Sequence, residues 1–151
     1  MKRGRAQRRR ASPPLVGALL RLAWQQVRVQ MAADVAAAGF DELQDAHLSV
    51  FQHPGPDGLR PVDLARQIRM SRQATNYLIA QLENLGYVQR RGENGERRRV
   101  YLTARGRKVQ DTIRASVKRS EARAARQVGR EPFDGFMNVL RTMAGGQWVD
   151  R

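Results

Sequence analysis

The change of residue pattern at Gly86 constrains the fold of this chain more than any other feature. The segment before Gly86 begins at a helix cap, Ser71, and carries buried-type residues at helical spacing: Thr75, Leu78, Ile79, Leu82 and Leu85. After Gly86, two short segments of strand-forming residues, YVQRR and RRRVYLT, surround Gly92 and Gly95, a pattern typical of a β-hairpin. Because this hairpin is too short to make its own core, the pattern predicts a small unit in which helices support two strands.

Helical periodicity covers most of the remaining chain. Pro13 and Pro14 open a first helix that ends near Gly39, and Pro61 opens a short one before Ser71. Thr103 caps a long helix directly after the hairpin. We expect four longer helices, at 15–38, at 41–53 with Asp41 as its cap, at 104–128, and at 132–144 following Pro132.

The short helix at Pro61 and the helix at Ser71 are joined by the tight link Arg69-Met70, and the hairpin follows them. This order predicts a winged helix-turn-helix, in which the small Ala65 lets the two helices approach closely. The expected fold is therefore mainly α with a small β-hairpin wing. In such a unit the first two turns of the second helix contact the major groove of DNA. The residues expected on that face suit base edges and phosphates: Ser71, Arg72, Gln73, Asn76 and Tyr77.

Positive charge gathers in the same part of the chain. The formal net charge is +14, and residues 59–108, with twelve basic and four acidic groups, account for +8 of it. Like charges across a hairpin repel, so the arginines of the wing, residues 90–99, indicate an external anion. Nucleic acid is the commonest polyanion, and we expect Arg97 or Arg98 to enter the minor groove. The wing residues assigned to DNA are Arg90, Arg91, Arg97, Arg98 and Arg99.

The first twelve residues carry six basic and no acidic groups and show no apolar periodicity. They are predicted to form a disordered basic arm, in which Arg8, Arg9 and Arg10 either contact DNA or are simply solvated.

Several classes of function are disfavoured by what the sequence lacks. It has no cysteine, which excludes disulfides and thiol chemistry, and no stretch approaches the roughly 20 apolar residues of a membrane span. His47 and His53 lie on different helical faces, so no metal site is expected, and His47 is expected to be a hydrogen-bonded core residue. The glycines of the wing fit no phosphate-binding motif. We expect a cytoplasmic protein that is not an enzyme and has no resident cofactor.

The segment PVDLARQIRMSRQATNYLIAQLENLGYVQRR, followed by RRRVYLTARG, resembles the DNA-binding core of the MarR family of bacterial transcription regulators. The matching residues include Leu64-Ala65, Ser71, Gly86-Tyr87-Val88 and Leu102-Thr103. The order and lengths of the flanking helices also agree with the family.

The resemblance implies a homodimer formed by the first and the last two helices, which binds a pseudo-palindromic operator, commonly as a repressor. It also implies a cleft for a small-molecule effector, for which Trp24, His47 and Phe51 are candidates, although large side chains on amphipathic helices are more often core. One departure concerns the wing, where the family's Asp-x-Arg motif is replaced by NGERRR. Either the wing is shortened, or Glu96 takes the place of the aspartate in a shifted register.

These inferences divide the chain into four parts: a basic arm at 1–12, a dimerisation helix at 13–40, a winged helix-turn-helix at 41–103, and C-terminal dimerisation helices at 104–151. The expected function is sequence-specific regulation of transcription on double-stranded DNA. The alternatives are an architectural protein that coats DNA without sequence preference, and a winged-helix module that binds an acidic protein.

Overall fold

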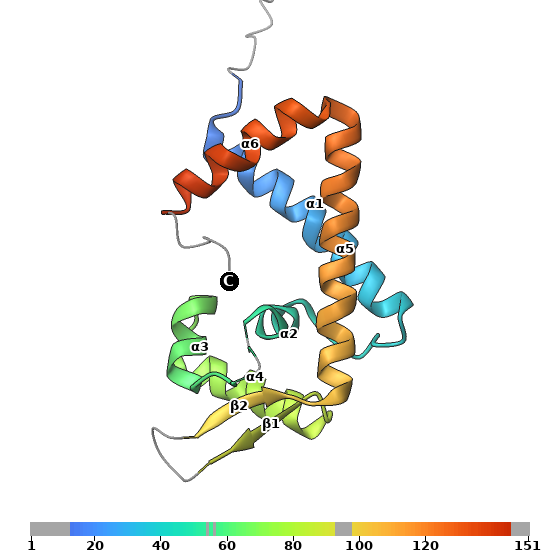
Figure 1. Cartoon of the computed structure of the whole chain (residues 1–151). Coiled ribbons are helices and arrows are strands. Elements are labelled where there is room, and N and C mark those ends of the chain that lie inside the picture. Colours follow the sequence, from blue (N-terminus) through green and yellow to red (C-terminus); the bar gives the residue numbers. More distant parts are fainter. Residues whose placement is uncertain (1–12, 54, 56, 93–97, 146–151) are drawn as a thin grey trace, which may run out of the picture.

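The computed structural model describes residues 13–53, 55, 57–92 and 98–145 (Figure 1). Its elements in chain order are α1 (Val16–Ala37), α2 (Asp45–Leu48), the 3-10 helix η1 (Val50–Gln52), α3 (Pro61–Ile68), α4 (Arg72–Asn84), β1 (Val88–Arg91), β2 (Arg99–Leu102), α5 (Ala104–Val128) and α6 (Arg130–Met143). The prediction of a mainly helical chain with one β-hairpin is confirmed.

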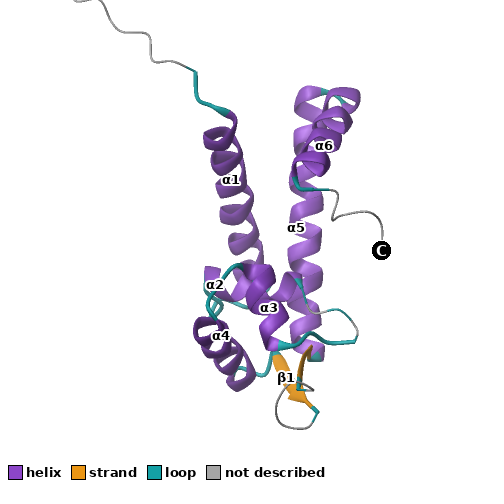
Figure 2. Ribbon diagram, turned by 90° about the vertical axis from the view of Figure 1, so that its left-hand side faces the viewer, coloured by secondary structure: helices purple, strands orange, loops and turns teal. Residues whose placement is uncertain are grey.

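The long helix α5 connects the two ends of the molecule (Figure 1). At one end it adjoins the hairpin, with α3 and α4 close by, and at the other end it leads into α6. In the view turned by 90°, α1 and α5 rise from the winged end, where their lower parts share one core, and they diverge toward the other end (Figure 2). The DNA-binding unit expected from the sequence and α6 therefore occupy opposite ends of the molecule (Figure 1).

The N-caps predicted at Ser71 and Thr103 are present. The Ser71 hydroxyl accepts a hydrogen bond from the Ala74 amide at 3.1 Å, and the Thr103 hydroxyl accepts one from the Gly106 amide at 3.1 Å. Gly86 follows α4 with a φ of 78°, a left-handed conformation that glycine adopts without strain. These local signals determine where the helices on either side of the hairpin begin and end.

The hairpin pairs Val88 with Leu102 and Arg90 with Val100 in antiparallel register. A short bridge extends the hairpin, because Leu59 and Val100 exchange backbone hydrogen bonds of 3.1 and 2.9 Å. The bridge ties the start of α3 to the exit strand of the wing.

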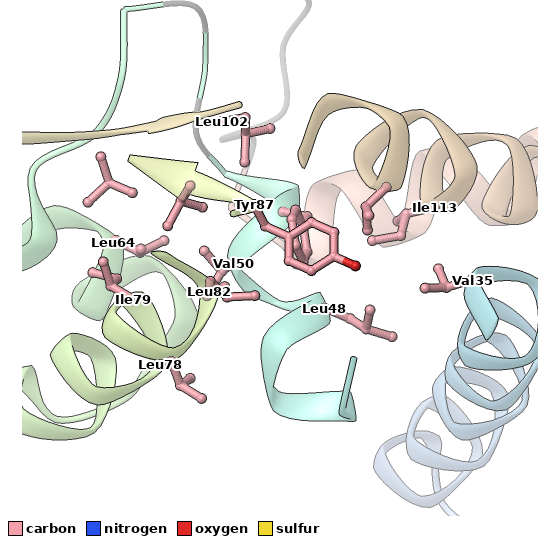
Figure 3. Close-up of a cluster of buried hydrophobic side chains, with 14 of the residues drawn as sticks. Val35, Leu48, Val50, Leu64, Leu78, Ile79, Leu82, Tyr87, Leu102 and Ile113 are labelled. Atoms are coloured by element: carbon pink, nitrogen blue, oxygen red, sulfur yellow. The ribbon is translucent and has the colours of Figure 1, made fainter. Parts of the chain in front are cut away.

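Tyr87, at the junction between α4 and β1, is fully buried at the centre of the core (Figure 3). Its ring meets Phe51 and Phe40 edge to face, with centroids 5.8 and 6.1 Å apart. The surrounding apolar residues come from α1, α2, α4, the hairpin and α5, and include Val35, Leu48, Leu82, Val100 and Ile113. One core thus fixes the winged unit to the lower parts of α1 and α5.

Two expected helices differ from the structure. The single helix at 41–53 is wrong: α2 has four residues, its N-cap is Gln44 rather than Asp41, and a separate 3-10 turn follows. The residues after Gly39 turn instead, so that Phe40 reaches Tyr87. The last helix begins at Arg130, not after Pro132, since proline is tolerated in a first turn whose N–H groups have no intrahelical partner.

Apolar side chains remain exposed on the terminal helices. None of the residues of α6, all of which are described, is buried in the single chain. The large exposed apolar residues of these helices are Leu15 just before α1, Val16, Leu19, Leu22, Trp24 and Val29 in α1, Val128 in α5, and Phe136, Val139 and Met143 in α6. Among the described residues, no helix combines the length and the apolar character that a membrane crossing requires.

Candidate nucleic-acid interface

Helix α4 has one buried and one exposed face. Thr75, Leu78, Ile79 and Leu82 pack into the core, as the spacing predicted. Arg72, Gln73 and Asn76 are exposed on the other face, and Tyr77 is 66% exposed, which is unusual for a tyrosine in the middle of a helix. Ser71 is exposed as well, but its hydroxyl is engaged as the helix cap.

The turn between α3 and α4 holds this face in place. Arg69 adopts a left-handed conformation with a φ of 55°, and the Met70 amide donates to the Ala65 carbonyl at 3.0 Å. This pattern closes α3 as a left-handed C-cap. Ala65 is 4% exposed, in agreement with a small residue where the two helices approach.

A hollow of about 440 Å³ lies beside the exposed face of α4. Its lining comes from the start of α3, from α4, from β1 and from the residue before β2. It consists of Arg60, Pro61, Val62, Arg72, Asn76, Arg90 and Arg98. Four of the seven lining residues are arginines. The structure therefore brings together two residues of the expected recognition helix and two of the expected wing arginines.

Arg60 was not among the residues selected from the sequence. It precedes Pro61 at the start of α3, and the Leu59–Val100 bridge brings it beside the wing. Its Nε donates to the Asp63 carboxylate at 2.5 Å, which lowers the pKa of that carboxyl. Asp63 thus stays ionised and offsets part of the positive charge at this edge. The signal in the sequence that could have identified Arg60 is a basic residue directly before a proline-initiated helix.

Arg90 connects the hairpin to α4. Its side chain is 20% exposed, its Nη2 donates to the Asn76 carbonyl at 3.3 Å, and its Nε lies 3.7 Å from the Glu83 carboxylate. The Arg90 amide also donates to Glu83, at 3.0 Å. The side chain therefore acts as a brace between strand and helix, in addition to lining the hollow.

Arg91 and Arg99 are exposed and pair with each other across the hairpin. The Arg91 guanidinium lies over the Tyr101 ring, 5.4 Å from its centroid, and Arg99 donates to the Gly58 carbonyl at 3.2 Å. Arg98 is half-buried in the hollow. Arg97 and the arm residues Arg8, Arg9 and Arg10 lie outside the described residues, so their assignment remains a prediction.

The three residues expected to line an effector cleft have different environments. Phe51 is 0% exposed and packs on Tyr87, and His47 is 3% exposed, whereas Trp24 is 48% exposed on α1. His47 Nδ1 accepts from the Gln44 amide at 3.1 Å, so its Nε2 carries the proton donated to the Gln81 side chain at 3.0 Å. His47 is thus the hydrogen-bonded core histidine that was expected. In the single chain none of these three residues lines the hollow beside α4 or the cavity on the other face of the hairpin.

A polar cluster joins the winged unit to α5. The Tyr87 hydroxyl donates a short hydrogen bond to Glu42, and Arg105 Nη2 donates to the same carboxylate at 2.6 Å. The Arg105 guanidinium also lies over the Tyr87 ring, 4.4 Å from the centroid. The hydrogen bond from Tyr87 lowers the pKa of Glu42, while burial and the hydrogen bond to Glu42 raise the pKa of Tyr87. Within the described ranges, no three His, Cys, Asp or Glu side chains gather in a metal-binding arrangement.

A model of the MarR family matches residues 52–99, which contain α3, α4 and most of the hairpin. No curated protein matches the chain. Among solved structures, a MarR-family transcriptional regulator of Rhodococcus sp. RHA1 shares the fold with 20% identity and a TM-score of 0.72, over 91% of this chain and 100% of that one.

Two further solved structures carry ligands. The transcriptional repressor CouR bound to a 23-mer DNA duplex is 25% identical, with a TM-score of 0.67, over 86% of this chain and 92% of that one. A MarR-family protein of Mycobacterium tuberculosis in complex with salicylic acid is also 25% identical, with a TM-score of 0.65, over 88% and 98% of the two chains.

Proposed function

We propose that this chain, whose winged helix matches the MarR family of transcriptional regulators, binds a pseudo-palindromic operator as a homodimeric repressor. In this proposal, residues 71–85 enter the major groove and the wing, residues 90–99, lies near the minor groove. The four-part division of the chain into arm, first dimerisation helix, winged unit and C-terminal dimerisation helices belongs to the same proposal.

The observation that carries the proposal is the exposed polar face of α4 beside an arginine-lined hollow. Arg72, Gln73 and Asn76 are side chains that pair with base edges, and they face solvent in the first two turns of α4. The guanidinium groups of Arg60 and Arg98 lie in the adjoining hollow, where they suit phosphates. CouR, whose structure contains a DNA duplex, supports this use of the fold.

Exposed apolar side chains on α1 and α6 support the homodimer. A monomer that left Leu19, Trp24 and Phe136 in water would forgo the free energy of burying them. A second copy of the chain, covering these helices, would place two copies of α4 in successive major grooves, roughly 34 Å apart.

A small-molecule effector is the second part of the proposal. The M. tuberculosis relative was crystallised with salicylic acid, and we propose that this chain also binds a small organic ligand. Trp24 is the accessible member of the three residues selected from the sequence. His47 and Phe51 would support such a site from within the core rather than line it.

Selection of binding sites from random duplexes, with purified full-length protein at a stated salt concentration, tests the central proposal. We expect a two-fold symmetric motif whose half-sites are about one helical turn apart. Recovery of no enriched motif, despite DNA binding, would instead favour the architectural alternative.

Deletion of residues 1–12 also distinguishes a sequence-specific regulator from an architectural protein that coats DNA. A protein that coats DNA through its basic arm should lose most of its affinity, whereas a specific regulator should keep its motif. Absence of DNA binding at low salt, together with a co-purifying acidic protein, would favour the interaction-module alternative and contradict the proposal.

A further inference from the structure

The hairpin has a second arginine-lined cavity on the side opposite the recognition helix. This cavity of about 380 Å³ shares no lining residue with the hollow beside α4. Successive strand residues point to opposite faces, and β1 follows this rule, since Arg90 lines the hollow beside α4 while Gln89 and Arg91 line the second cavity. We refer to the second cavity as the outer cavity.

The outer cavity lies between the outer face of the hairpin and the first half of α5. Its polar lining residues are Gln89, Arg91, Tyr101, Arg107, Gln110 and Arg114. They supply three guanidinium groups, two side-chain amides and a phenol. None of the described residues that line it is acidic.

Several of these groups are held in position before any ligand is present. Arg107 Nη1 donates to the Leu102 carbonyl at 3.0 Å, and the Gln110 amide donates to the Phe51 carbonyl at 2.8 Å. The Arg91 guanidinium lies over the Tyr101 ring. Since a guanidinium has five N–H donors in a fixed fork, one backbone contact orients Arg107 and leaves donors for a second acceptor. Preorganised donors bind an anion at a lower entropic cost.

Charge argues that the occupant is an anion with more than one negative charge. Three arginines around one cavity repel each other, and the Arg114–Asp111 pair, at 4.0 Å, joins side chains that are both largely exposed. Exposed pairs at this distance contribute little. A dianion would compensate the three guanidinium groups better than a monoanion, and the arginine fork matches phosphate oxygens.

We propose that the outer cavity binds a small organic phosphate. The volume lies within the range of ligand sites, about 300–1,000 Å³, and exceeds what a bare phosphate ion fills. The phosphate group contacts the arginines, and the organic part packs near Tyr101 and Leu102, which also line the cavity. The DNA backbone is a less suitable occupant, because a duplex laid on α4 meets the hollow on the other face of the hairpin, and Arg91 alone among the residues lining the outer cavity is also assigned to DNA.

Isothermal titration calorimetry on the full chain at a pH of about 8, where phenyl phosphate is a dianion, tests the proposal directly. We expect one phenyl phosphate per chain, and weaker binding of benzoate, which has the same ring and a single charge. Arg114→Gln should weaken phenyl phosphate binding roughly tenfold. Arg107→Gln should do the same, but it also removes the hydrogen bond to the Leu102 carbonyl, so Arg114→Gln is the better variant for this test.

Lys108→Gln is the matched control, because it removes one positive charge from α5 directly after Arg107 but outside the cavity lining. An equal loss of affinity in this control, binding of several ligands per chain, or equal affinity for benzoate would each overturn the proposal. Weakening by Arg98→Gln instead of Arg114→Gln would also overturn it, because the ligand would then occupy the hollow beside α4.

Ligand binding has a consequence for DNA binding that rests on the proposed function. Arg91 is assigned both to the outer cavity and to the wing, so a bound phosphate competes with DNA for its guanidinium. Phenyl phosphate at a concentration that just saturates the wild type, at matched ionic strength, should weaken duplex binding by the wild type more than by Arg114→Gln. Absence of all DNA binding would refute the proposed function. Calorimetry needs no DNA, so it would still show whether the outer cavity binds phenyl phosphate.

Discussion

Arg90 and Arg91 are neighbours in one strand, and their side chains serve different surfaces. Arg90 braces β1 against α4 through the Asn76 carbonyl and Glu83, and its side chain is largely buried. Arg91 lies on the opposite face of the hairpin, over Tyr101. Arg90 therefore connects the wing to the recognition helix, whereas Arg91 faces away from it.

Removing the brace should cost stability as well as DNA affinity. We expect Arg90→Ala to lower the free energy of unfolding by about 1–3 kcal/mol, because Glu83 and the Asn76 carbonyl lose a charged partner in a partly buried position. Chemical denaturation followed by circular dichroism measures the change. Arg72→Ala, an exposed position on α4, is the control and should change stability by less than about 0.5 kcal/mol. Equal effects of the two substitutions would contradict the brace.

The backbone of Asn76 has a structural role, and its side chain has the expected role in recognition. Its backbone carbonyl accepts the hydrogen bond from Arg90, while its side chain is exposed beside the hollow. Asn76→Ala should therefore leave stability nearly unchanged and relax sequence preference at one position per half-site, at a cost of about 1–3 kcal/mol of discrimination. Site selection with the variant measures this preference, and an unchanged motif would show that Asn76 reads no base.

The sequence was informative about which arginines are present and on which face of a strand each lies, but not about their partners. Alternation along β1 separates Arg90 from Arg91. The pairing of Arg90 with the Asn76 carbonyl depends on how α4 packs against the hairpin, which no local pattern encodes. Arg60 was missed for the same reason, because its proximity to the wing follows from the Leu59–Val100 bridge.

At the scale of elements, the junction of the hairpin with α5 requires a glycine. A Cβ at Gly106 would lie 2.1 Å from the Tyr87 carbonyl oxygen, a backbone atom that cannot move aside. Gly106→Ala should destabilise the protein by about 2 kcal/mol or more. Gly135→Ala, in α6 with nothing within 4 Å of the added carbon, should stabilise it by up to about 1 kcal/mol. Thermal unfolding of both variants checks the prediction, which a tolerated Gly106→Ala would refute.

The Glu42 cluster joins three elements, and its strength should depend on pH. The folded-state pKa of Glu42 lies below its ordinary value of 4.5, chiefly because Tyr87 donates to it. A carboxyl group whose pKa is lower in the folded state adds to the free energy of unfolding. This contribution is fully present above about pH 4.5 and is lost as the pH falls through the folded-state pKa. Glu42→Gln should therefore lower the Tm at pH 7 more than at a pH of about 3.

Glu121→Gln, an exposed position on α5, serves as the control for this titration. The difference in Tm between the control and the wild type should change less with pH than the difference for Glu42→Gln. An equal pH dependence of both variants would mean that the Glu42 cluster contributes no linked stability.

The ends of the capped helices could be predicted from the sequence, whereas the structure of residues 41–53 could not. Ser71, Thr103 and Gly86 act locally, so their positions in the sequence define helix ends. Residues 41–53 showed helical spacing, yet the chain uses Phe40 and Glu42 to reach Tyr87, more than forty residues away. Tertiary contacts thus override the periodicity there, and only a short helix starting at Asp45 remains.

At the scale of the whole molecule, polar and apolar surfaces lie at opposite ends. The arginine-lined hollow belongs to the winged end, whereas α6 and the first half of α1 carry exposed apolar side chains (Figure 1). A single chain offers DNA one recognition helix. Dimerisation through the apolar end would bury that surface and double the number of base contacts, so operator affinity and self-association should be linked.

Phe136 tests this linkage, because its ring is 48% exposed on the apolar face of α6. Phe136→Glu should convert the proposed dimer to a monomer, since it places a carboxylate where an apolar ring would be buried, and burying a charge is costly. Light scattering coupled to size-exclusion chromatography measures the change. The monomer should bind a two-half-site duplex no more tightly than a duplex with one half-site. Asn138→Glu adds the same charge to α6 at an exposed polar position outside the exposed apolar residues Phe136, Val139 and Met143, and should remain dimeric; a dimeric Phe136→Glu would place the interface elsewhere.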